Sequence, residues 1–415
     1  MKAEFQSLPA FPENPLTPQS SLQEWERWTQ TPMIGFYRYS SIATIQLPTA
    51  DLEEPKSKSK LNDGMERDSG GLSDNNDSVV LTRKGHKFDP EDEKRTPNQD
   101  RVLVLSKRDD NIDDRNNDDN NADWWLGLFD GHGYHGHAVS QYVSLEFARR
   151  INKEWENETT TRSKAADSSK SSVMVKDTLK NTFLEINRSI PSFINSAGCT
   201  GISVLKRGNS LYISNVGDSL AFVASYNKAN NAYSTVKIIY STSPHKPDTP
   251  SERKRIEAAG GRVQDAPFEG ASARLIIPVN KFQIVGLAMS RSLGDHDGEK
   301  VGLIAEPVTD VLDLTQFDKN QEYIVVAVTD GLVDFGKLSA EEVALSMAKA
   351  LSSSQSTQKR IILNKEDQKN LRRSPASVSS TEAAAQLISR ASQLWDREPG
   401  NYRDDISIIA HKLRF

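Results

Sequence analysis

The sequence contains one cysteine, Cys199, among its 415 residues. A single cysteine cannot form a disulfide within the chain, and such scarcity is typical of proteins from a reducing compartment. No stretch is long and apolar enough to span a membrane, and residues 1–5 match neither a signal peptide nor a myristoylation start. We therefore expect a protein of the cytoplasm or the nucleus, without a membrane span.

The chain also has no surplus of basic over acidic residues. The formal net charge is -5 at pH 7, so the composition provides no general case for a nucleic-acid partner. Hydrophobic residues are scarce, at 36%, whereas 26% of the residues are charged, which indicates a globular body with polar extensions. Residues 1–77 show little periodicity and predict a disordered or loosely docked N-terminal arm. One domain over residues 78–415 is expected to carry polar insertions near 106–123, 154–172 and 352–380.

Strand patterns dominate the predicted domain. Short apolar runs predict strands at 78–81, 101–105, 124–129, 200–205, 210–216, 220–224, 236–240, 322–329 and 406–410. Apolar residues at helical spacing predict helices at 138–151, 173–193, 339–351 and 381–395, and a short helix begins at Pro250 and ends at Gly260. Many strands with few long helices indicate stacked sheets flanked by helices.

Acidic residues at the ends of these strands are the candidate functional groups. The apolar run 124–129 leads into Asp130-Gly131-His132, and the run 322–329 leads into Asp330-Gly331. Further acids at strand ends are Asp100, Asp218 and Asp404. One strand-end aspartate is ordinary turn chemistry. Several oxygen ligands without a Cys/His quartet, however, favour Mg²⁺ or Mn²⁺ over zinc.

Several short motifs follow one another along the chain. They are Pro97-Asn98-Gln99-Asp100, Phe129-Asp130-Gly131-His132-Gly133, Gly198-Cys199-Thr200, Asn215-Val216-Gly217-Asp218-Ser219, His245-Lys246-Pro247, Arg255-Ile256-Glu257-Ala258-Ala259-Gly260-Gly261, Leu287-Ala288-Met289-Ser290-Arg291-Ser292-Leu293-Gly294-Asp295, Ile304-Ala305-Glu306-Pro307, Asp330-Gly331-Leu332-Val333-Asp334 and Arg403-Asp404-Asp405-Ile406-Ser407. In this order they resemble the metal-dependent serine/threonine protein phosphatases of the 2C type. The Asn-Gln-Asp and Gly-Leu-Ala-Met-Ser-Arg forms look most like those of plant and algal-type members.

The resemblance implies an α+β fold with a metal centre. A central β-sandwich of two antiparallel sheets would be flanked by pairs of helices, giving four layers, with two Mg²⁺ or Mn²⁺ ions at one end. By motif position, Asp130 bridges both ions and the Gly131 carbonyl binds one of them. Asp330 and Asp404 bind the other ion in the same scheme.

Further roles are implied for four positions around that centre. Asp218 matches an acid linked to a weaker third ion in some members, and Asp100, with Gln99, matches a pair that holds metal-bound water. Arg95 falls where many members place a phosphate-binding arginine. His132 is the candidate general acid, which protonates the departing serine or threonine oxygen; such proton transfer contributes roughly 10²–10⁴-fold.

The implied reaction is hydrolysis of phosphoserine and phosphothreonine in proteins by direct attack of a bridging metal-bound water. Phosphorylated proteins are then the substrates and partners, and we expect a monomer. Leu220 departs from the family pattern, which usually has an arginine there, and puts catalytic efficiency in doubt more than metal binding. The alternative is a catalytically weak or inactive phosphatase-like module that acts as a binding or scaffold protein.

Two other functions fit the sequence poorly. Asp334-Phe335-Gly336 spells a kinase triplet, but no glycine-rich loop and no His-Arg-Asp loop accompany it. His132, His135 and His137 crowd one window without the spacing of a helical zinc site. Residues 245–274 match instead the family's mobile flap beside the site, which we expect to shape substrate choice.

Overall fold

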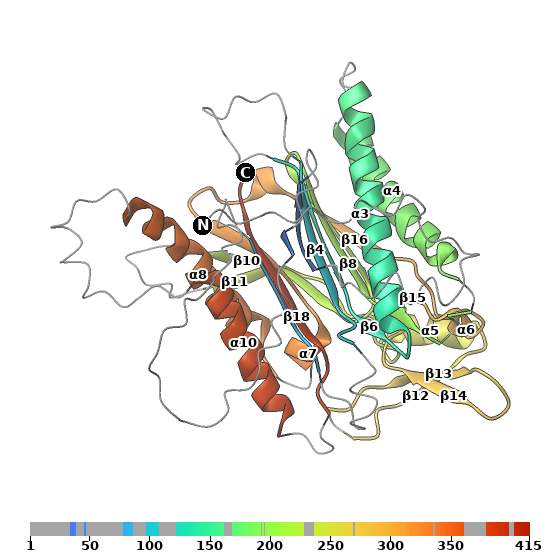
Figure 1. Ribbon diagram of the computed structural model, residues 1–415. Helices are drawn as coiled ribbons and strands as arrows, with labels where there is room; N and C mark the ends of the chain where they lie inside the picture. The colour runs from blue at the N-terminus through green and yellow to red at the C-terminus, as the bar shows by residue number, and fades with distance from the viewer. Residues whose placement is uncertain are drawn as a thin grey trace.

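A computed structural model of the chain shows two β-sheets packed between two pairs of helices (Figure 1). It describes residues 34–38, 45–46, 78–85, 97–107, 122–161, 168–227, 236–334, 337–360, 379–397 and 402–415, apart from the single positions 192, 195 and 269. The predicted α+β sandwich flanked by helices is thereby confirmed.

The larger sheet has the order β16-β9-β8-β5-β4-β1-β2. Its strands are β1 (Ile34–Arg38), β2 (Ile45–Gln46), β4 (Arg101–Ser106), β5 (Trp124–Phe129), β8 (Gly201–Arg207), β9 (Ser210–Val216) and β16 (Val308–Asp313). Neighbouring strands are antiparallel except β1 and β4, which pair in parallel from Ile34 opposite Val102 to Arg38 opposite Ser106. Two short strands of the expected N-terminal arm therefore lie at the edge of this sheet.

The smaller sheet has the order β11-β10-β17-β18-β3, and all of its pairs are antiparallel. Its strands are β3 (Ser78–Arg83), β10 (Leu220–Tyr226), β11 (Val236–Ser241), β17 (Glu322–Val328) and β18 (Ile406–Leu413). The central strand β17 is buried along nearly its whole length, which explains its continuous apolar run of Tyr, Ile, Val and Ala.

Side chains that alternate along the strands form the core between the sheets. Trp124, Leu126 and Leu128 of β5 face the smaller sheet, whereas Trp125 and Phe129 face the helices. Gly127 lies under the Trp125 ring, where a Cβ atom would approach the ring to 2.4 Å. Because strand side chains alternate with period two, a continuous apolar run such as β5 can be buried on both faces.

Two pairs of helices cover the outer faces of the sandwich (Figure 1). The helices α3 (Gly136–Thr161) and α4 (Ser168–Ser189) pack on the larger sheet, and α8 (Ala340–Arg360) and α10 (Ser380–Trp395) pack on the smaller one. All four helices were predicted, but α3 and α8 each continue about nine or ten residues past their predicted ends. Most of the range 154–172, expected as a polar insertion, is therefore helical.

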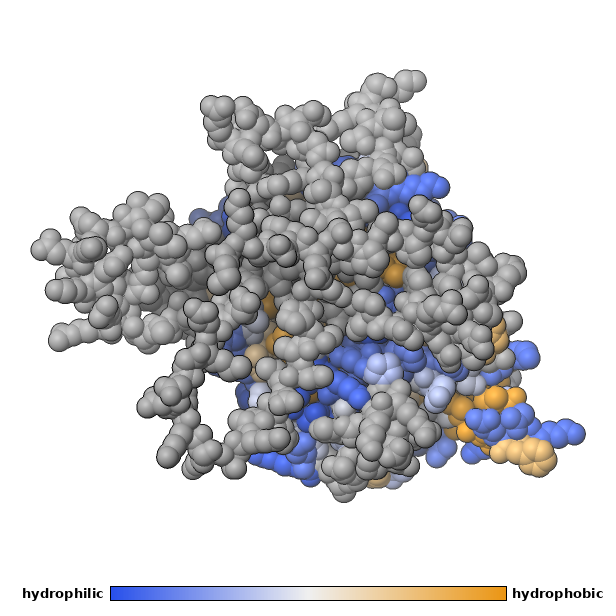
Figure 2. Space-filling model, in the orientation of Figure 1, coloured by the Kyte–Doolittle hydropathy of each residue, from blue (hydrophilic) through white to orange (hydrophobic). Residues whose placement is uncertain are grey.

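A separate small unit projects beside one end of the sandwich. It consists of α5 (Pro250–Ala258) and a three-stranded sheet of β12 (Arg262–Gln264), β13 (Arg274–Pro278) and β14 (Ile284–Leu287), which share their own apolar core. This unit contains most of the predicted flap, and we refer to residues 245–290 as the flap. Figure 2 shows apolar surface in this region, where Phe282 and Ile284 are exposed.

Short elements complete the fold near the flap. They are β6 (Gly131–His132), β7 (Gly198–Cys199), β15 (Leu293–Gly294), α6 (His296–Glu299), α7 (Asp330–Val333) and the 3₁₀ turn Leu314–Gln316. In the part of the chain that the structure describes, we find no helix with both the length and the apolar character needed to cross a membrane. Arg95, the acidic run at 109–121 and most of the range 352–380 lie outside the described residues.

Candidate active site

The acidic residues predicted as metal ligands come from both sheets and meet at one end of the sandwich. Asp130 follows β5 of the larger sheet, whereas Asp330 follows β17 of the smaller one. Asp404 precedes β18, the neighbour of β17. In Figure 1 this end lies near the labels β6 and α7. Asp130 and Asp330, which are 200 residues apart in the sequence, thus contribute to one site.

Burial and mutual repulsion perturb these carboxyl groups. Burial, and next the charge of Asp100, raise the pKa of Asp130 well above its ordinary value. Burial, and next the charge of Asp404, raise the pKa of Asp330 in the same way. Asp218 adds to the repulsion on both residues. Like charges held together away from water are unfavourable unless a cation compensates them, so the site favours cation binding.

Asp100 lies fully buried within this group of acids. Its Oδ2 accepts hydrogen bonds from Ser407 Oγ at 2.6 Å and from Thr329 Oγ1 at 3.3 Å. Burial, together with the charge of Asp405, raises its pKa to about 8. Its Oδ1 is buried and has no hydrogen-bond partner among the described residues. Asp100 is therefore oriented by hydroxyl groups on β18 and directly after β17, and it keeps one oxygen available for a ligand.

Backbone contacts hold the loops around the site together. Asp405 accepts hydrogen bonds from the amides of Gly85, at 2.6 Å, and Gln99, at 2.8 Å. The Gln99 side chain donates to the carbonyl of Gly133 at 2.7 Å, which fastens the turn that follows Asp130. At Gly131, a Cβ atom would lie 2.5 Å from a carbonyl oxygen of that turn. Because the backbone of the turn approaches Gly131 this closely, only glycine fits at this position.

A second set of acids lies beside the first and includes Asp334, which the sequence patterns did not indicate as a ligand. One oxygen each from Asp218, Asp330 and Asp334 lies within 4.8 Å of the others; we call these residues the Asp218 cluster. Asp330 and Asp334 are four residues apart at the two ends of α7, a spacing that places both on one side of a helical turn. That spacing is the signal by which Asp334 could have been found.

Lys246 joins the Asp218 cluster from the flap. Its Nζ donates to Asp218 Oδ2 at 2.8 Å and to Asp334 Oδ2 at 3.0 Å. Burial alone would lower the pKa of this ammonium group, but the charges of Asp218 and Asp334 raise it above its ordinary value. The sequence motif His245-Lys246-Pro247 pointed to the family without indicating this contact.

The donor set fits hard divalent cations. Asp100 Oδ1, Asp218 Oδ1 and Asp330 Oδ1 are buried and have no hydrogen-bond partner among the described residues. Buried carboxylate oxygens are normally hydrogen-bonded or bound to a cation. Oxygen ligands of this kind, with no thiolate among them, suit Mg²⁺ or Mn²⁺. Asp130, Asp330 and Asp404 are the residues that would hold two such ions.

His132 lies next to the acids and is held by a carboxylate of its own. Its Nε2 lies 2.6 Å from Oδ2 of Asp295, which also accepts a hydrogen bond from Ser292 Oγ at 2.7 Å. Burial lowers the pKa of His132. The charge of Asp295 and its hydrogen bond raise this pKa by more than burial lowers it, so the net shift is upward. The imidazole is thus biased toward its protonated form, as a general acid requires.

Other predicted features fall elsewhere. Leu220 begins β10 opposite Val328 and packs against the apolar cluster beneath α8 and α10, so it belongs to the sandwich. Burial lowers the pKa of His137 to about 4.

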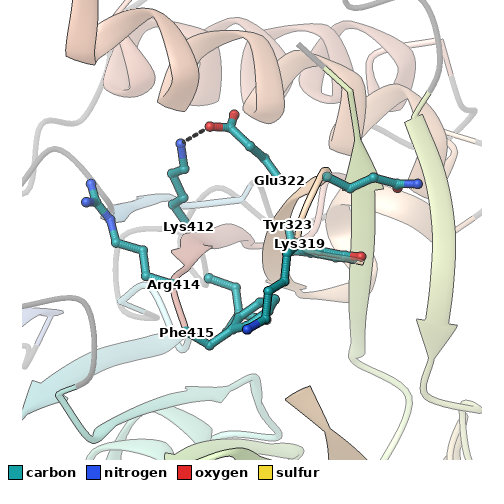
Figure 3. A pocket seen from close by; sticks show the side chains of 8 residues that line it. Lys319, Glu322, Tyr323, Lys412, Arg414 and Phe415 are labelled. Carbon is teal, nitrogen blue, oxygen red and sulfur yellow. Dashed lines mark hydrogen bonds and ion pairs between the residues drawn. The ribbon is translucent and has the colours of Figure 1, made fainter. Parts of the chain in front are cut away.

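A cavity of about 340 Å³ lined by residues such as Glu322, Lys412 and Phe415 lies at the opposite end of β17 from Asp330 (Figure 3). It contains none of the predicted site residues.

The chain is similar in sequence to proteins of one family. A family model described as Protein phosphatase 2C matches residues 75–373. "Probable protein phosphatase 2C 41" of Arabidopsis thaliana is 30% identical over 216 residues, which is 51% of this chain and 58% of that protein. "Probable protein phosphatase 2C 34" of the same plant is 29% identical over 296 residues, which is 69% of this chain and 71% of that protein.

A solved structure has the same fold. The serine-threonine phosphatase 2C from Toxoplasma gondii superposes with a TM-score of 0.56 at 16% sequence identity, covering 81% of this chain and 94% of that one. Among the curated relatives, the match spans 58%, 52% and 64% of the length of three of them. Those relatives therefore contain sequence beyond the region shared with this chain.

Proposed function

The chain belongs to the protein phosphatase 2C family, and we propose that it hydrolyses phosphoserine and phosphothreonine in proteins with two bound Mg²⁺ or Mn²⁺ ions. The observation that carries this proposal is the convergence of Asp130, Asp330 and Asp404 from both sheets, with strong mutual repulsion. Holding repelling carboxylates together costs stability, so a site of this kind is retained for ligand binding.

Each residue of the site has a chemical task in this reaction. Asp130 would contact both ions, the Gly131 carbonyl one of them, and Asp330 and Asp404 the other. When bound, the ions would neutralise the phosphate dianion, orient it and activate the attacking water. The carboxylates keep the ligands in place without rearrangement during the reaction, which is the main contribution of a preorganised polar site.

His132 and Asp295 would act on the leaving group. Attack of water forms a new oxygen–phosphorus bond as the bond between phosphorus and the serine or threonine oxygen breaks. We assign His132 as the donor of a proton to that departing oxygen. Asp295 binds Nε2 at 2.6 Å, so Nδ1, which has no hydrogen-bond partner among the described residues, remains for the substrate.

Hydrolysis of a phosphothreonine peptide tests the proposal. We expect turnover with Mn²⁺, none in excess chelator, and a loss of at least about 100-fold in Asp130→Asn. The exposed acid Asp248 provides a matched control, and Asp248→Asn should retain activity. Activity that survives chelation would contradict a metal-dependent reaction. A folded protein without activity in any divalent metal would instead indicate a phosphatase-like binding module.

A further inference from the structure

Trp395, the last residue of α10, contacts the short helix α7 at its start and just beyond its end. The indole Nε1 donates a hydrogen bond of 2.7 Å to the carbonyl of Gly331 in α7. Lys337 follows α7 in the chain, and its Nζ lies 4.6 Å from the centre of the Trp395 ring. At that distance an ammonium group is attracted to an aromatic face. Both side chains are buried, so these contacts are shielded from water.

The hydrogen bond to Gly331 fixes the part of α7 that carries Asp330. Asp330 is the first residue of α7 and directly precedes Gly331. Gly331 has little room, because a Cβ atom there would collide with the carbonyl oxygen of Asp405. The turn is thus held by the backbone at Asp405 and by the indole of Trp395. The direction in which the Asp330 side chain leaves the backbone depends on this turn.

The same indole supports a second residue beside the metal site. The rings of Trp395 and Tyr402 meet edge to face, with centroids 6.0 Å apart and an interplanar angle of 78°. The side chain of Tyr402 forms a hydrogen bond with the carboxylate of Asp404. Burial, and next the charge of Asp404, raise the pKa of the Tyr402 hydroxyl above its ordinary value. The hydroxyl therefore keeps its proton at neutral pH and is the donor in this hydrogen bond.

One tryptophan thus stands behind both side chains that we assign to the same ion, Asp330 and Asp404. A carboxylate binds a metal tightly only when it is held in the right direction, and residues that orient metal ligands contribute roughly 10- to 100-fold to affinity. The turn after Asp130 is fastened differently, by the hydrogen bond from the Gln99 side chain to the Gly133 carbonyl. The two ions would therefore depend on different parts of the fold.

We propose that Trp395 is a positioning residue of the metal centre, which acts through Gly331 and Tyr402 to orient the two carboxylates of one ion. The inference rests on the proposed function, because it uses the ligand assignment made there. It adds that this ion depends on the end of α10, whereas the ion held by the Gly131 carbonyl depends on the turn after β5.

Direct measurement of Mn²⁺ binding to the metal-free protein tests the inference without reference to activity. The EPR signal of free Mn²⁺ reports how many ions bind and how tightly. We expect wild type to bind two ions. Trp395→Phe keeps an aromatic ring in the core but removes the indole N–H. It should weaken one ion by at least about ten-fold and leave the affinity for the other nearly unchanged.

Two further variants show which ion is affected. Tyr402→Phe removes only a hydroxyl group and should weaken the same ion, so it decides the question even if circular dichroism shows that Trp395→Phe does not fold. Asp404→Asn should leave one bound ion. Adding Trp395→Phe to Asp404→Asn should not weaken that remaining ion further, because its ligands do not depend on the indole.

Matched controls separate positioning from a general loss of stability. Trp125→Phe removes another buried indole hydrogen bond, of 2.8 Å to Ser203 Oγ. Tyr240→Phe removes a hydroxyl that donates to Asp310 at 2.9 Å, away from the metal site. Both control variants should bind two ions as tightly as wild type does.

The possible outcomes distinguish this inference from the proposed function. Two ions bound with wild-type affinity in both Trp395→Phe and Tyr402→Phe would overturn the inference and leave the proposed function intact. Equal weakening of both ions in Trp395→Phe would also overturn it, because the effect would then be a general one. Failure of wild type to bind any Mn²⁺ would overturn the inference and the proposed function together.

Discussion

Asp295 adopts an unusual backbone conformation beside His132. Among the described residues it is the only non-glycine residue with a positive φ, at 49°. Aspartate tolerates this region better than most residues, but the conformation persists only where surrounding contacts hold it. Here Ser292 Oγ donates to Asp295 Oδ2, and the Asp295 amide donates to the Ala197 carbonyl at 3.0 Å. The conformation aims the carboxylate at His132.

We predict that Asp295 acts as a positioning residue for His132. Asp295→Asn should lower kcat on a phosphothreonine peptide by roughly 10- to 100-fold and should have a smaller effect on p-nitrophenyl phosphate, whose leaving group needs little protonation. His132→Gln should show the same leaving-group pattern with a larger loss. The measurement is kcat for both substrates in each variant and in the double variant.

The double variant separates positioning from folding. If Asp295 acts through His132, Asp295→Asn should add little to the loss in His132→Gln, because coupled residues are not additive. Asp297→Asn is the control, since this neighbouring acid contacts Ser196 rather than His132. Equal losses on both substrates would contradict the positioning role.

At the scale of elements, a buried carboxylate ties helix α5 to the segment at the end of the flap. Glu252 of α5 binds Arg291 Nη2 at 2.6 Å and Arg255 Nη2 at 2.6 Å, and it accepts a hydrogen bond from Ser290 Oγ at 2.7 Å. Burial by itself would raise the pKa of Glu252. These donors lower the pKa by more than burial raises it, and the result is a pKa of about 2. The carboxylate form is thus strongly preferred in the folded protein.

We predict that this carboxylate stabilises the fold in a pH-dependent manner. A carboxyl group whose pKa is depressed by folding contributes stability above its unfolded pKa of 4.5, and the contribution is lost as the pH falls from 4.5 toward 2. Glu252→Gln should therefore lower the free energy of unfolding near pH 6 by about 1–2 kcal/mol, with allowance for solvent screening. The difference from wild type should shrink near pH 3.5.

Urea unfolding at several pH values measures this difference. Glu257→Gln, which changes an exposed acid on the same helix, is the control and should have no comparable pH-dependent effect. A difference between wild type and Glu252→Gln that stays constant from pH 6 to pH 3.5 would show that the charge of Glu252 does not contribute.

Strands with continuous buried runs were predicted accurately, whereas the ends of helices in polar sequence were not. The strands β5 and β9 have the predicted bounds, because buried strands carry uninterrupted apolar runs. The helices α3 and α8 extend beyond their predicted ends into polar sequence. Helical hydrogen bonding can continue without apolar periodicity, so the pattern of apolar residues does not mark such ends.

At the scale of the whole molecule, the sandwich stabilises an end that is electrostatically unfavourable. Apolar clusters lie between the sheets and beneath both helix pairs. At the site end, the acids Asp130 and Asp330 are buried with raised pKa values. The large core offsets this local repulsion, and a bound cation would relieve it.

We predict that metal binding and charge removal both stabilise the protein, but not additively. Mn²⁺ at 100 times its dissociation constant should contribute about 2.7 kcal/mol and raise Tm by several degrees. Asp330→Asn should raise the Tm of the metal-free protein by about 2–4 °C, because one repelling charge is removed, and should reduce the increase caused by Mn²⁺. Calorimetry with and without Mn²⁺ measures both effects.

The exposed acid Asp248 again provides the control, and Asp248→Asn should change neither Tm nor the response to Mn²⁺. A metal-free Asp330→Asn protein that melts below wild type would contradict the view that repulsion at the site costs stability.

The sequence by itself predicted stacked sheets flanked by helices, most strands of the sandwich and the strand-end acids Asp130, Asp330 and Asp404, but not the strands β1, β2 and β16. These features are local, because an apolar run followed by an aspartate can be recognised within a few residues. Only the tertiary structure decided that His132 contacts Asp295 and that Lys246 contacts Asp218 and Asp334. The paired residues lie on separate loops, and loops meet only after the strands that carry them have packed.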